Sequence, residues 1–227
     1  PIQNIGAYGI ELSDRFDSLE VVDKTTGQYK KMSIEDCQFG YRDSLFKRAG
    51  QDKYIIVSVN LRLSLKPNIS IEYPALKNSL MRLHTQLQMK HGQSFEECLT
   101  PKMISDIVCS IRRSKLPDPL KIPNIGSFFK NPIVTSENLL SLRKLYPDIV
   151  SYNFCDENMK ISAGYLIEKA GWKGYEKDGV GVDHRQALVL VNLGGSAEDI
   201  LSLAHEIKIS IFEKFSIELE IEPRIYR

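Results

Sequence analysis

The sequence predicts an α+β protein built from two parts. Two segments carry this prediction. Apolar and polar side chains alternate from Tyr54 to Leu65 at the two-residue period of a strand, whereas apolar side chains recur from Pro101 to Lys115 at the period of a helix. Strand patterns dominate the first third of the chain, and helices alternate with strands in the last third. The pattern changes between residues 66 and 100, where we place a domain boundary.

Length and composition fit this assignment and exclude several kinds of protein. The 227 residues suffice for two domains with cores, and 42% hydrophobic and 26% charged residues are typical of a soluble globular chain. A formal net charge of +1 gives no general attraction to nucleic acid or anionic membranes. No apolar run reaches the roughly 20 residues that span a bilayer.

The cysteines and histidines point to a reduced, metal-free protein. Four of each are present, without a C-x-x-C pair or the spacing of zinc ligands. No secretory signal is visible at the start of the sequence. We therefore expect a cytoplasmic protein with free thiols and no metal site.

The first third is predicted to form a sheet. A strand over Asp17–Asp23 is followed by a turn at Thr25–Gly27 and a returning strand over Gln28–Met32. Ser33-x-x-Asp36 has the pattern of a helix cap. In the strand Tyr54–Leu65 the odd positions are apolar and are expected to face the core: Ile55, Val57, Val59, Leu61, Leu63 and Leu65.

The rest of the chain is predicted to alternate helices and strands. Capping residues and apolar spacing predict helices over Pro74–Lys90, Pro101–Lys115, Ser136–Tyr146 and Gly164–Ala170. A longer helix follows the cap Ser196-x-x-Asp199, with an apolar face formed by Ile200, Leu203, Ala204, Ile207, Ile211 and Phe215. A buried strand is expected at Ala187–Val191, and a closing strand with alternating apolar residues at Ile217–Ile221.

The segment from Ile122 to Pro132 is the first candidate for chemistry. Gly126 allows a tight bend, the flanking prolines resist helix, and Ser127, Lys130 and Asn131 offer a hydroxyl, an ammonium and an amide. One interpretation is a loop that presents these groups to a cavity. The other is a structural bend with Phe128 and Phe129 in the core.

Charged residues give three further candidates, each with a structural alternative. Arg42 and Glu222 could stabilise a developing anion, or could be a surface ion-pair partner and a solvated strand residue. Arg112, Arg113 and Lys115 could clamp a phosphate, or could complement the negative end of a helix dipole. An RNA-binding function is disfavoured by the balanced charge. A hydrolase that uses Ser127 would lack a base, because no G-x-S-x-G, P-loop or Cys/His dyad is present.

Six motifs, in order along the chain, carry a resemblance to a known family. They are Pro1–Gly9, Phe39–Ser44, Lys115–Pro119, Gly126–Pro132, Gln186–Asn192 and Glu213–Phe215. Together they closely resemble the UDP-N-acetylenolpyruvoylglucosamine reductases, flavoenzymes that make UDP-N-acetylmuramate for bacterial peptidoglycan. The resemblance runs from residue 1 to about residue 225.

The resemblance implies an activity and three catalytic residues. In the family, NADPH reduces bound FAD, and the flavin passes hydride to the enolpyruvyl ether of the substrate. Arg42 and Glu222 match the residues that stabilise the resulting charge, and Ser127 matches the proton donor. The implied partner is a small UDP-sugar, with no nucleic acid and no membrane, and we expect a monomer.

The resemblance also implies binding residues and domains. Substrate contacts are expected at Tyr73, Lys115, Asn131, Tyr152, Lys160 and Gln186. FAD contacts are expected at Ile2, Asn4, Ile5, Gly6, Ile56, Arg112 and Arg224. The implied parts are the C-terminal part of a PCMH-type FAD-binding domain (residues 1–66), a connector (67–99), an α+β substrate-binding domain (100–218) and a strand returning to the flavin site (219–227).

The sequence also departs from the family pattern. Ile125 replaces the usual alanine, Asp183 precedes a histidine that is displaced by one position, and L-E-I-E-P-R leaves Glu220 and Glu222 as alternatives for the catalytic carboxylate, of which the spacing favours Glu222. The family carries a further N-terminal segment with glycine-rich loops for FAD. We therefore expect a truncated chain, and the alternative function is a UDP-sugar-binding fragment without turnover.

Overall fold

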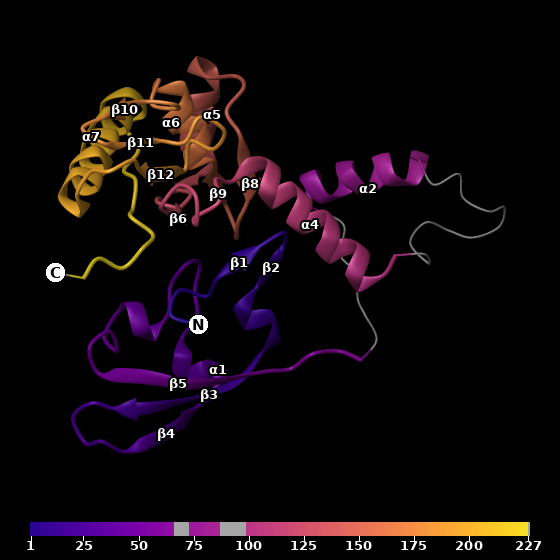
Figure 1. Ribbon diagram of the computed structural model, residues 1–227, viewed down its shortest axis with the longest axis vertical. Helices are drawn as coiled ribbons and strands as arrows, with labels where there is room; N and C mark the ends of the chain where they lie inside the picture. Colours follow the sequence, from indigo (N-terminus) through magenta and orange to yellow (C-terminus); the bar gives the residue numbers. More distant parts are fainter. Residues whose placement is uncertain (66–72, 87–98, 227) are drawn as a thin grey trace. The chain divides into compact units, whose positions relative to one another are not determined.

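The computed structural model describes residues 1–65, 73–86 and 99–226 (Figure 1). They form two compact units, Pro1–Ile111 and Arg112–Arg227. Most of the predicted connector 67–99, and the end of the predicted helix Pro74–Lys90, lie outside the described residues. Helices and sheets occur together in the chain, as the prediction of an α+β fold requires.

Unit 1 is built around a three-stranded antiparallel sheet with the order β4-β3-β5. Its elements are β1 (Gly6–Ala7), β2 (Ile10–Glu11), a 3-10 turn (Leu12–Arg15), β3 (Phe16–Asp23), β4 (Tyr29–Met32), α1 (Ile34–Cys37), a second 3-10 turn (Leu45–Lys47), β5 (Tyr54–Leu61) and α2 (Pro74–Gln86). The Ser33 cap predicted for α1 is confirmed, since Ser33 and Asp36 form a capping box. The main core consists of Phe16, Leu19, Val21, Met32, Cys37 and Phe46.

The prediction that the odd positions of Tyr54–Leu65 face the core is wrong. The strand ends at Leu61, and Ile55 and Val57 are both more than half exposed. Leu61, Leu63 and Leu65 are exposed as well. The cause is a register shift between β3 and β5: Val21 lies opposite Ile56, whereas Leu19 lies opposite Val59, so Val57 is skipped. A bulge of this kind changes which residues face the core: of the predicted positions Val59 packs there, and the even position Ile56 packs beside it.

A second, smaller core of unit 1 lies between α2 and the first part of α4 (Pro101–Lys115). It buries Leu76, Leu80 and Leu99 against Met103, Ile104, Ile107 and Val108. The hydroxyl of Thr100 accepts the amide of Met103, which confirms the predicted start of α4.

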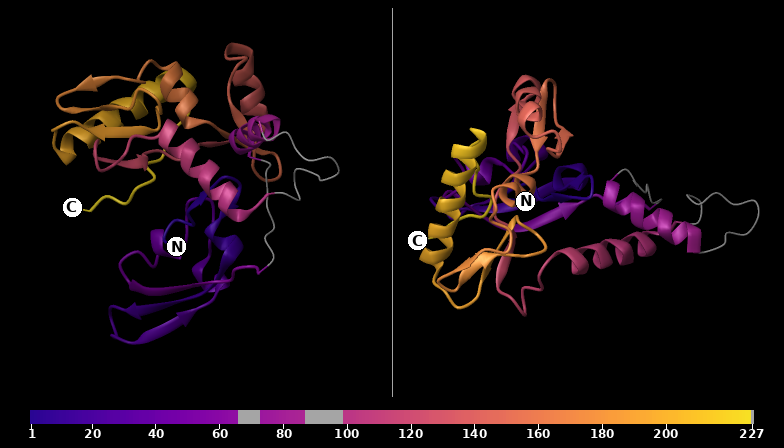
Figure 2. Two further views of the ribbon diagram at one scale, coloured as in Figure 1. Left: turned by 45° about the vertical axis from the view of Figure 1, so that its right-hand side comes forward. Right: turned by 90° about the horizontal axis from the view of Figure 1, so that it is seen from above.

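Unit 2 contains two antiparallel sheets, with the strand orders β10-β11-β12-β6 and β7-β9-β8. Its strands are β6 (Asn124–Ser127), β7 (Ile133–Thr135), β8 (Ser151–Asn153), β9 (Asn158–Ile161), β10 (Glu176–Lys177), β11 (Val180–Val182) and β12 (Val189–Asn192). Its helices are α5 (Ser136–Leu145), α6 (Ala163–Lys169) and α7 (Ala197–Phe215). The long yellow helix α7 packs on β11 and β12 (Figure 2).

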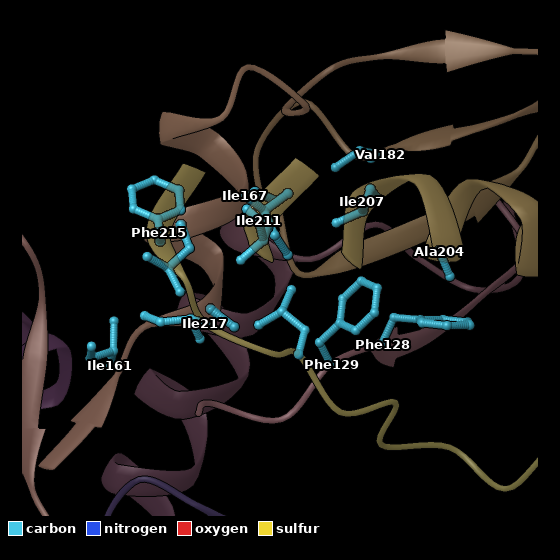
Figure 3. Close-up of a cluster of buried hydrophobic side chains, with 14 of the residues drawn as sticks. Phe128, Phe129, Ile161, Ile167, Val182, Ala204, Ile207, Ile211, Phe215 and Ile217 are labelled. Atoms are coloured by element: carbon cyan, nitrogen blue, oxygen red, sulfur yellow. The ribbon is translucent and has the colours of Figure 1, made fainter. Parts of the chain in front are cut away.

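A large apolar cluster lies between α7 and these sheets (Figure 3). The predicted inner face of α7 is confirmed, because Leu203, Ala204, Ile207, Ile211 and Phe215 are buried and Ile200 packs against them. Phe128 and Phe129 enter the same cluster from the segment that follows β6. The core of unit 2 therefore fixes the position of the Ser127 loop.

The segment Ile217–Ile221 differs from its prediction. It buries Ile217 and Leu219 at alternating positions, but pairs with the rest of unit 2 through one isolated bridge, between Phe129 and Ile221. Within the described ranges, no helix has the length and apolar character needed to cross a bilayer.

Candidate functional site

Two buried aromatic rings anchor the loop that carries Ser127 in the core of unit 2. Gly126 adopts a φ of 77°, which favours glycine, and its amide donates to the side chain of Asn124 at 3.0 Å. Phe128 and Phe129 pack edge to face at 5.4 Å and are almost fully buried. Ser127 itself is exposed at the end of β6. The segment is therefore a structural bend with both rings in the core, as the second interpretation predicts, and it leaves Ser127 exposed.

The C-terminal segment lies directly beside this loop. The amide of Glu222 donates to the carbonyl of Phe128 at 2.9 Å, and the amide of Lys130 donates to the carbonyl of Glu220 at 2.9 Å. The side chain of Lys130 is only 11% exposed, and its ammonium forms an ion pair with the carboxylate of Glu220. The carboxylate of Glu220 is therefore engaged by Lys130, and the backbone of Glu222 lies beside the Ser127 loop.

Asn131 and Gln186 meet at the first turn of α6. The side-chain oxygen of Asn131 accepts the amide of Ala163 at 3.0 Å. A Cβ placed on Gly164 would lie 3.3 Å from the side-chain oxygen of Gln186, so this amide group lies over the same turn. Gln186 also accepts the amide of Leu188 at 3.4 Å. Each side chain thus uses its oxygen as a hydrogen-bond acceptor within unit 2.

Tyr152 and Lys160 form a neighbouring pair. They lie directly opposite one another in β8 and β9, which places their side chains on one face of the sheet. The ammonium of Lys160 lies 5.1 Å from the ring centre of Phe154, a cation–π contact. The amide of Ile161 donates to the carbonyl of Pro132, next to Asn131. Four predicted substrate residues therefore belong to one region of unit 2.

Phe154 was not predicted as a site residue. It is partly exposed and lies two positions after Tyr152, so the strand alternation could have indicated that both rings share a face. The remaining predicted substrate residue of unit 2, Lys115, is exposed at the end of α4, next to the predicted FAD contact Arg112.

Arg224 lines a largely apolar cavity of unit 2. The cavity has a volume of about 570 Å³ and is bordered by Ile125, Phe128, Ile200 and Tyr226, among others. The guanidinium of Arg224 lies 4.8 Å from the ring centre of Tyr226. A ligand with an apolar ring and an anionic group would match this lining.

In unit 1, Arg42 is bound to the N-terminal segment. Its guanidinium donates to the carbonyl of Gly6 at 2.5 Å and lies 3.7 Å from the carboxylate of Glu11. Arg42 adopts a φ of 51°, an uncommon conformation for a residue with a side chain. A Cβ on Gly6 would lie 3.1 Å from Arg42 and 2.9 Å from Glu11. The absence of a side chain at Gly6 therefore lets Arg42 adopt this position. Glu11 was not predicted.

The other predicted residues of unit 1 differ in their exposure and in their contacts. Asn4 is 2% exposed, and its side chain donates to Glu11 and to the carbonyl of Gly40 and accepts the amide of Ser13. Ile2 and Ile5 are exposed, whereas Ile56 packs against the sheet core. Tyr73 makes an edge-to-face contact with Tyr8, with ring centres 4.9 Å apart.

Residues 118–226 match the model of the family described as UDP-N-acetylenolpyruvoylglucosamine reductase, C-terminal domain. A protein of that name from Pseudomonas putida is 43% identical over 227 residues, which is the whole chain and 63% of the relative. One from Burkholderia mallei is 44% identical over 224 residues, 98% of the chain and 62% of the relative.

A solved structure agrees at the level of the fold. The crystal structure of UDP-N-acetylenolpyruvylglucosamine reductase from Thermus caldophilus has a TM-score of 0.57 and 21% identity, and the match covers the whole chain and 58% of that protein. The chain thus spans about three fifths of the length of the relatives it matches. The ordered motifs had predicted this similarity: the whole chain is similar to UDP-N-acetylenolpyruvoylglucosamine reductases, and residues 118–226 match the C-terminal domain of that family.

Proposed function

We propose that the chain binds UDP-N-acetylenolpyruvoylglucosamine through unit 2 and contributes to its NADPH- and FAD-dependent reduction to UDP-N-acetylmuramate, a step of peptidoglycan precursor synthesis. One observation carries the proposal. Asn131 and Gln186 meet at the first turn of α6, and the adjoining sheet presents the pair Tyr152 and Lys160. The names of the relatives support the same substrate.

The chemistry of these four side chains suits a UDP group. The ammonium of Lys160 pairs with a diphosphate, and the exposed ring of Tyr152 offers a surface for the pyrimidine. The oxygens of Asn131 and Gln186 are already engaged, so their NH₂ groups donate to ligand acceptors. Tyr73 and Lys115 are proposed as further contacts to the same ligand.

The residues proposed to contact FAD offer two kinds of group. Ile2 and Ile5 expose apolar side chains that fit a flavin ring, and Arg112 and Arg224 offer guanidinium groups that fit a diphosphate. Gly6 offers its backbone, and Ile56 belongs largely to the core. The side chain of Asn4 is fully engaged within unit 1, so only its backbone is suited to the cofactor. When bound, FAD supplies the hydride that it receives from NADPH.

The chain itself contributes the proton and the compensating charges. The hydroxyl of Ser127 donates a proton to the enolpyruvyl carbon that does not receive the hydride. Arg42 stabilises the negative charge that develops on the substrate carboxylate, and Glu222 shares this task in its protonated form, as a hydrogen-bond donor. A hydroxyl is a weak acid in water, but it can protonate a strongly basic carbon when it is held against it beside a cation.

A second candidate function is substrate binding without turnover. The observation that favours it is the length of the chain, which covers 63% of the Pseudomonas putida relative. In this case the UDP-sugar site of unit 2 would be retained, and the reduction would require residues that the present sequence does not include.

One experiment separates the two candidates. The chain is mixed with FAD, NADPH and the enolpyruvyl substrate, and NADPH absorbance and product are followed together. Equal amounts of NADPH consumed and UDP-N-acetylmuramate formed support the reductase. Calorimetric binding of the substrate without any turnover supports the binding function, and the absence of both binding and turnover contradicts the proposal.

A further inference from the structure

Asp183 is a buried carboxylate in the loop that connects β11 to β12. It is only 3% exposed. Burying a charge is costly unless hydrogen bonds compensate for it. A charged residue kept at such a position therefore requires a specific set of partners.

The partners of Asp183 are backbone amides of its own loop. One carboxylate oxygen accepts the amide of Arg185 and that of Gln186, both at 2.9 Å. This is the geometry of an Asx turn, in which a short side chain bonds the backbone two and three residues further on. The turn fixes the backbone of Gln186, the residue proposed to bind the UDP group.

The same loop is tied to the surrounding structure on both sides. The amide of Asp183 donates to the carbonyl of Val189, and the amide of Val189 donates to the carbonyl of Gln186. Val189 lies opposite Ser127 in the β12–β6 pairing. The side-chain oxygen of Gln186 lies next to Gly164 of α6, so a side chain at position 164 would contact it. Position 183 thus determines where the amide group of Gln186 lies.

Ion pairs contribute less to the position of Asp183. Nε of Arg185 lies 3.8 Å and Nδ1 of His184 lies 4.0 Å from the carboxylate of Asp183, both beyond hydrogen-bond distance, and the side chains of Arg185 and His184 are exposed to water. The two backbone hydrogen bonds at 2.9 Å are the closer contacts. The hydrogen bonds, and not the negative charge as such, hold the loop.

We infer that Asp183 is a positioning residue of the UDP-sugar site: its side chain folds the loop that holds the amide group of Gln186 over the first turn of α6. The inference rests on the proposed function, because it takes Gln186 to be a contact to UDP. It adds to that proposal the element that sets the position of this contact, and it predicts which substitutions at residue 183 can be tolerated.

The test is a mutant cycle read by calorimetric titration of UDP into the whole chain. Gln186→Ala and Asp183→Ala should each weaken UDP binding roughly tenfold, the loss expected for one or two hydrogen bonds to a ligand. The double variant Asp183→Ala/Gln186→Ala should bind no more weakly than either single variant, because Asp183 acts through Gln186. If the two losses multiply, Asp183 acts independently of Gln186 and the inference is wrong.

Conservative variants separate geometry from charge and cover the case in which Asp183→Ala fails to fold. Asp183→Asn keeps the acceptor oxygen and should restore UDP binding to within about threefold of the unsubstituted chain, because asparagine also forms Asx turns. Asp183→Glu keeps the charge but moves the acceptor, and should bind about as weakly as Gln186→Ala. The reverse order would overturn the inference. His184→Ala, in the same loop, serves as the matched control and should leave binding unchanged.

The result for Gln186→Ala shows whether the substrate contact or only the positioning role of Asp183 is wrong. If this variant binds UDP as tightly as the unsubstituted chain, the substrate contact in the proposed function is wrong, and the inference fails with it. If Gln186→Ala weakens binding while Asp183→Ala, folded by its urea transition, does not, only the positioning role is wrong.

Discussion

Unit 1 and unit 2 hold their candidate residues in different ways. In unit 1, Arg42 and Asn4 are bound to the backbone and to Glu11, so the groups proposed for chemistry also hold the fold together. In unit 2, Ser127 and Tyr152 are exposed above a large buried cluster that does not depend on them. Substitutions should therefore affect function and stability separately in unit 2, and both together in unit 1.

The largest expected effect is on the core beneath Ser127. Phe129→Ala removes a ring that is 1% exposed and packed on Phe128, and should lower the free energy of unfolding of unit 2 by about 3–5 kcal/mol. Urea unfolding followed by circular dichroism measures this. Phe212→Ala, at an exposed position of α7, is the control and should change stability by less than ~0.5 kcal/mol. Similar losses in both variants would show that the Ser127 loop is not anchored by this core.

The second prediction separates function from stability. Ser127→Ala should slow the oxidation of reduced flavin by the enolpyruvyl substrate by roughly 10²-fold or more, the effect of losing a general acid, and should leave flavin reduction by NADPH nearly intact. The measurement is stopped-flow absorbance on the flavin-loaded reductase, with Ser141→Ala as a control on the surface of α5. Stability should be unchanged because Ser127 is exposed. Equal slowing of both half-reactions would refute the proton-donor role.

In unit 1 a single substitution should affect both properties. Gly6→Ala places a Cβ within 3.1 Å of Arg42 and 2.9 Å of Glu11, and should cost about 1–3 kcal/mol of stability through overpacking. It should also displace Arg42 and reduce turnover. Gly40→Ala is the matched control, since its Cβ would meet only Asp43 at an ordinary 3.7 Å. A stable Gly6→Ala variant with full activity would break the comparison between the units.

Substrate binding in unit 2 should respond to Lys160 without loss of stability. Lys160→Ala removes the ammonium beside Phe154 and Tyr152 and should weaken UDP binding roughly tenfold, because a charge-assisted contact to the diphosphate is lost. The salt dependence of binding should fall as well. Lys144→Ala, an exposed lysine of α5, should behave as the unsubstituted chain. The measurement is calorimetry at two salt concentrations. An affinity that Lys160→Ala leaves unchanged would exclude Lys160 from the site.

The smallest effect concerns the thiols. Burial raises the pKa of Cys37 to about 11, whereas Cys109 and Cys155 are exposed. At pH 8, iodoacetamide should therefore label Cys109 and Cys155 and leave Cys37 unlabelled, as peptide mass spectrometry would show. The unfolded thiol loses its proton at a lower pH than the folded one, so stability should fall as the pH rises from about 9 toward 11. Rapid labelling of native Cys37 would show that unit 1 opens readily.

The sequence predicted local structure better than it predicted which face of a strand is buried. Capping boxes at Ser33 and Ser196 and the inner face of α7 depend on near neighbours, and they were found as expected. The burial of Tyr54–Leu65 depended on a bulge opposite β3, which the alternation of one strand does not contain.

The site shows the same limit. The family motifs predicted Asn131, Tyr152, Lys160 and Gln186, but not that the two amide oxygens are used within unit 2. Glu11 was missed, and Asp183 was noted only as a departure from the family pattern, for a related reason. Their importance comes from partners that the folded chain brings to them, and an isolated acidic residue in a sequence carries no sign of these partners.

The most direct test of the account is hydrogen–deuterium exchange of the whole chain with and without saturating UDP. If UDP binds at the proposed site, exchange should slow in three segments of unit 2. The first is the loop around Asn131, and the second is the strands that carry Tyr152 and Lys160, together with the first turn of α6. The third is the loop around Gln186. Unchanged exchange in all three segments, or protection confined to other described parts of the chain, would contradict the account.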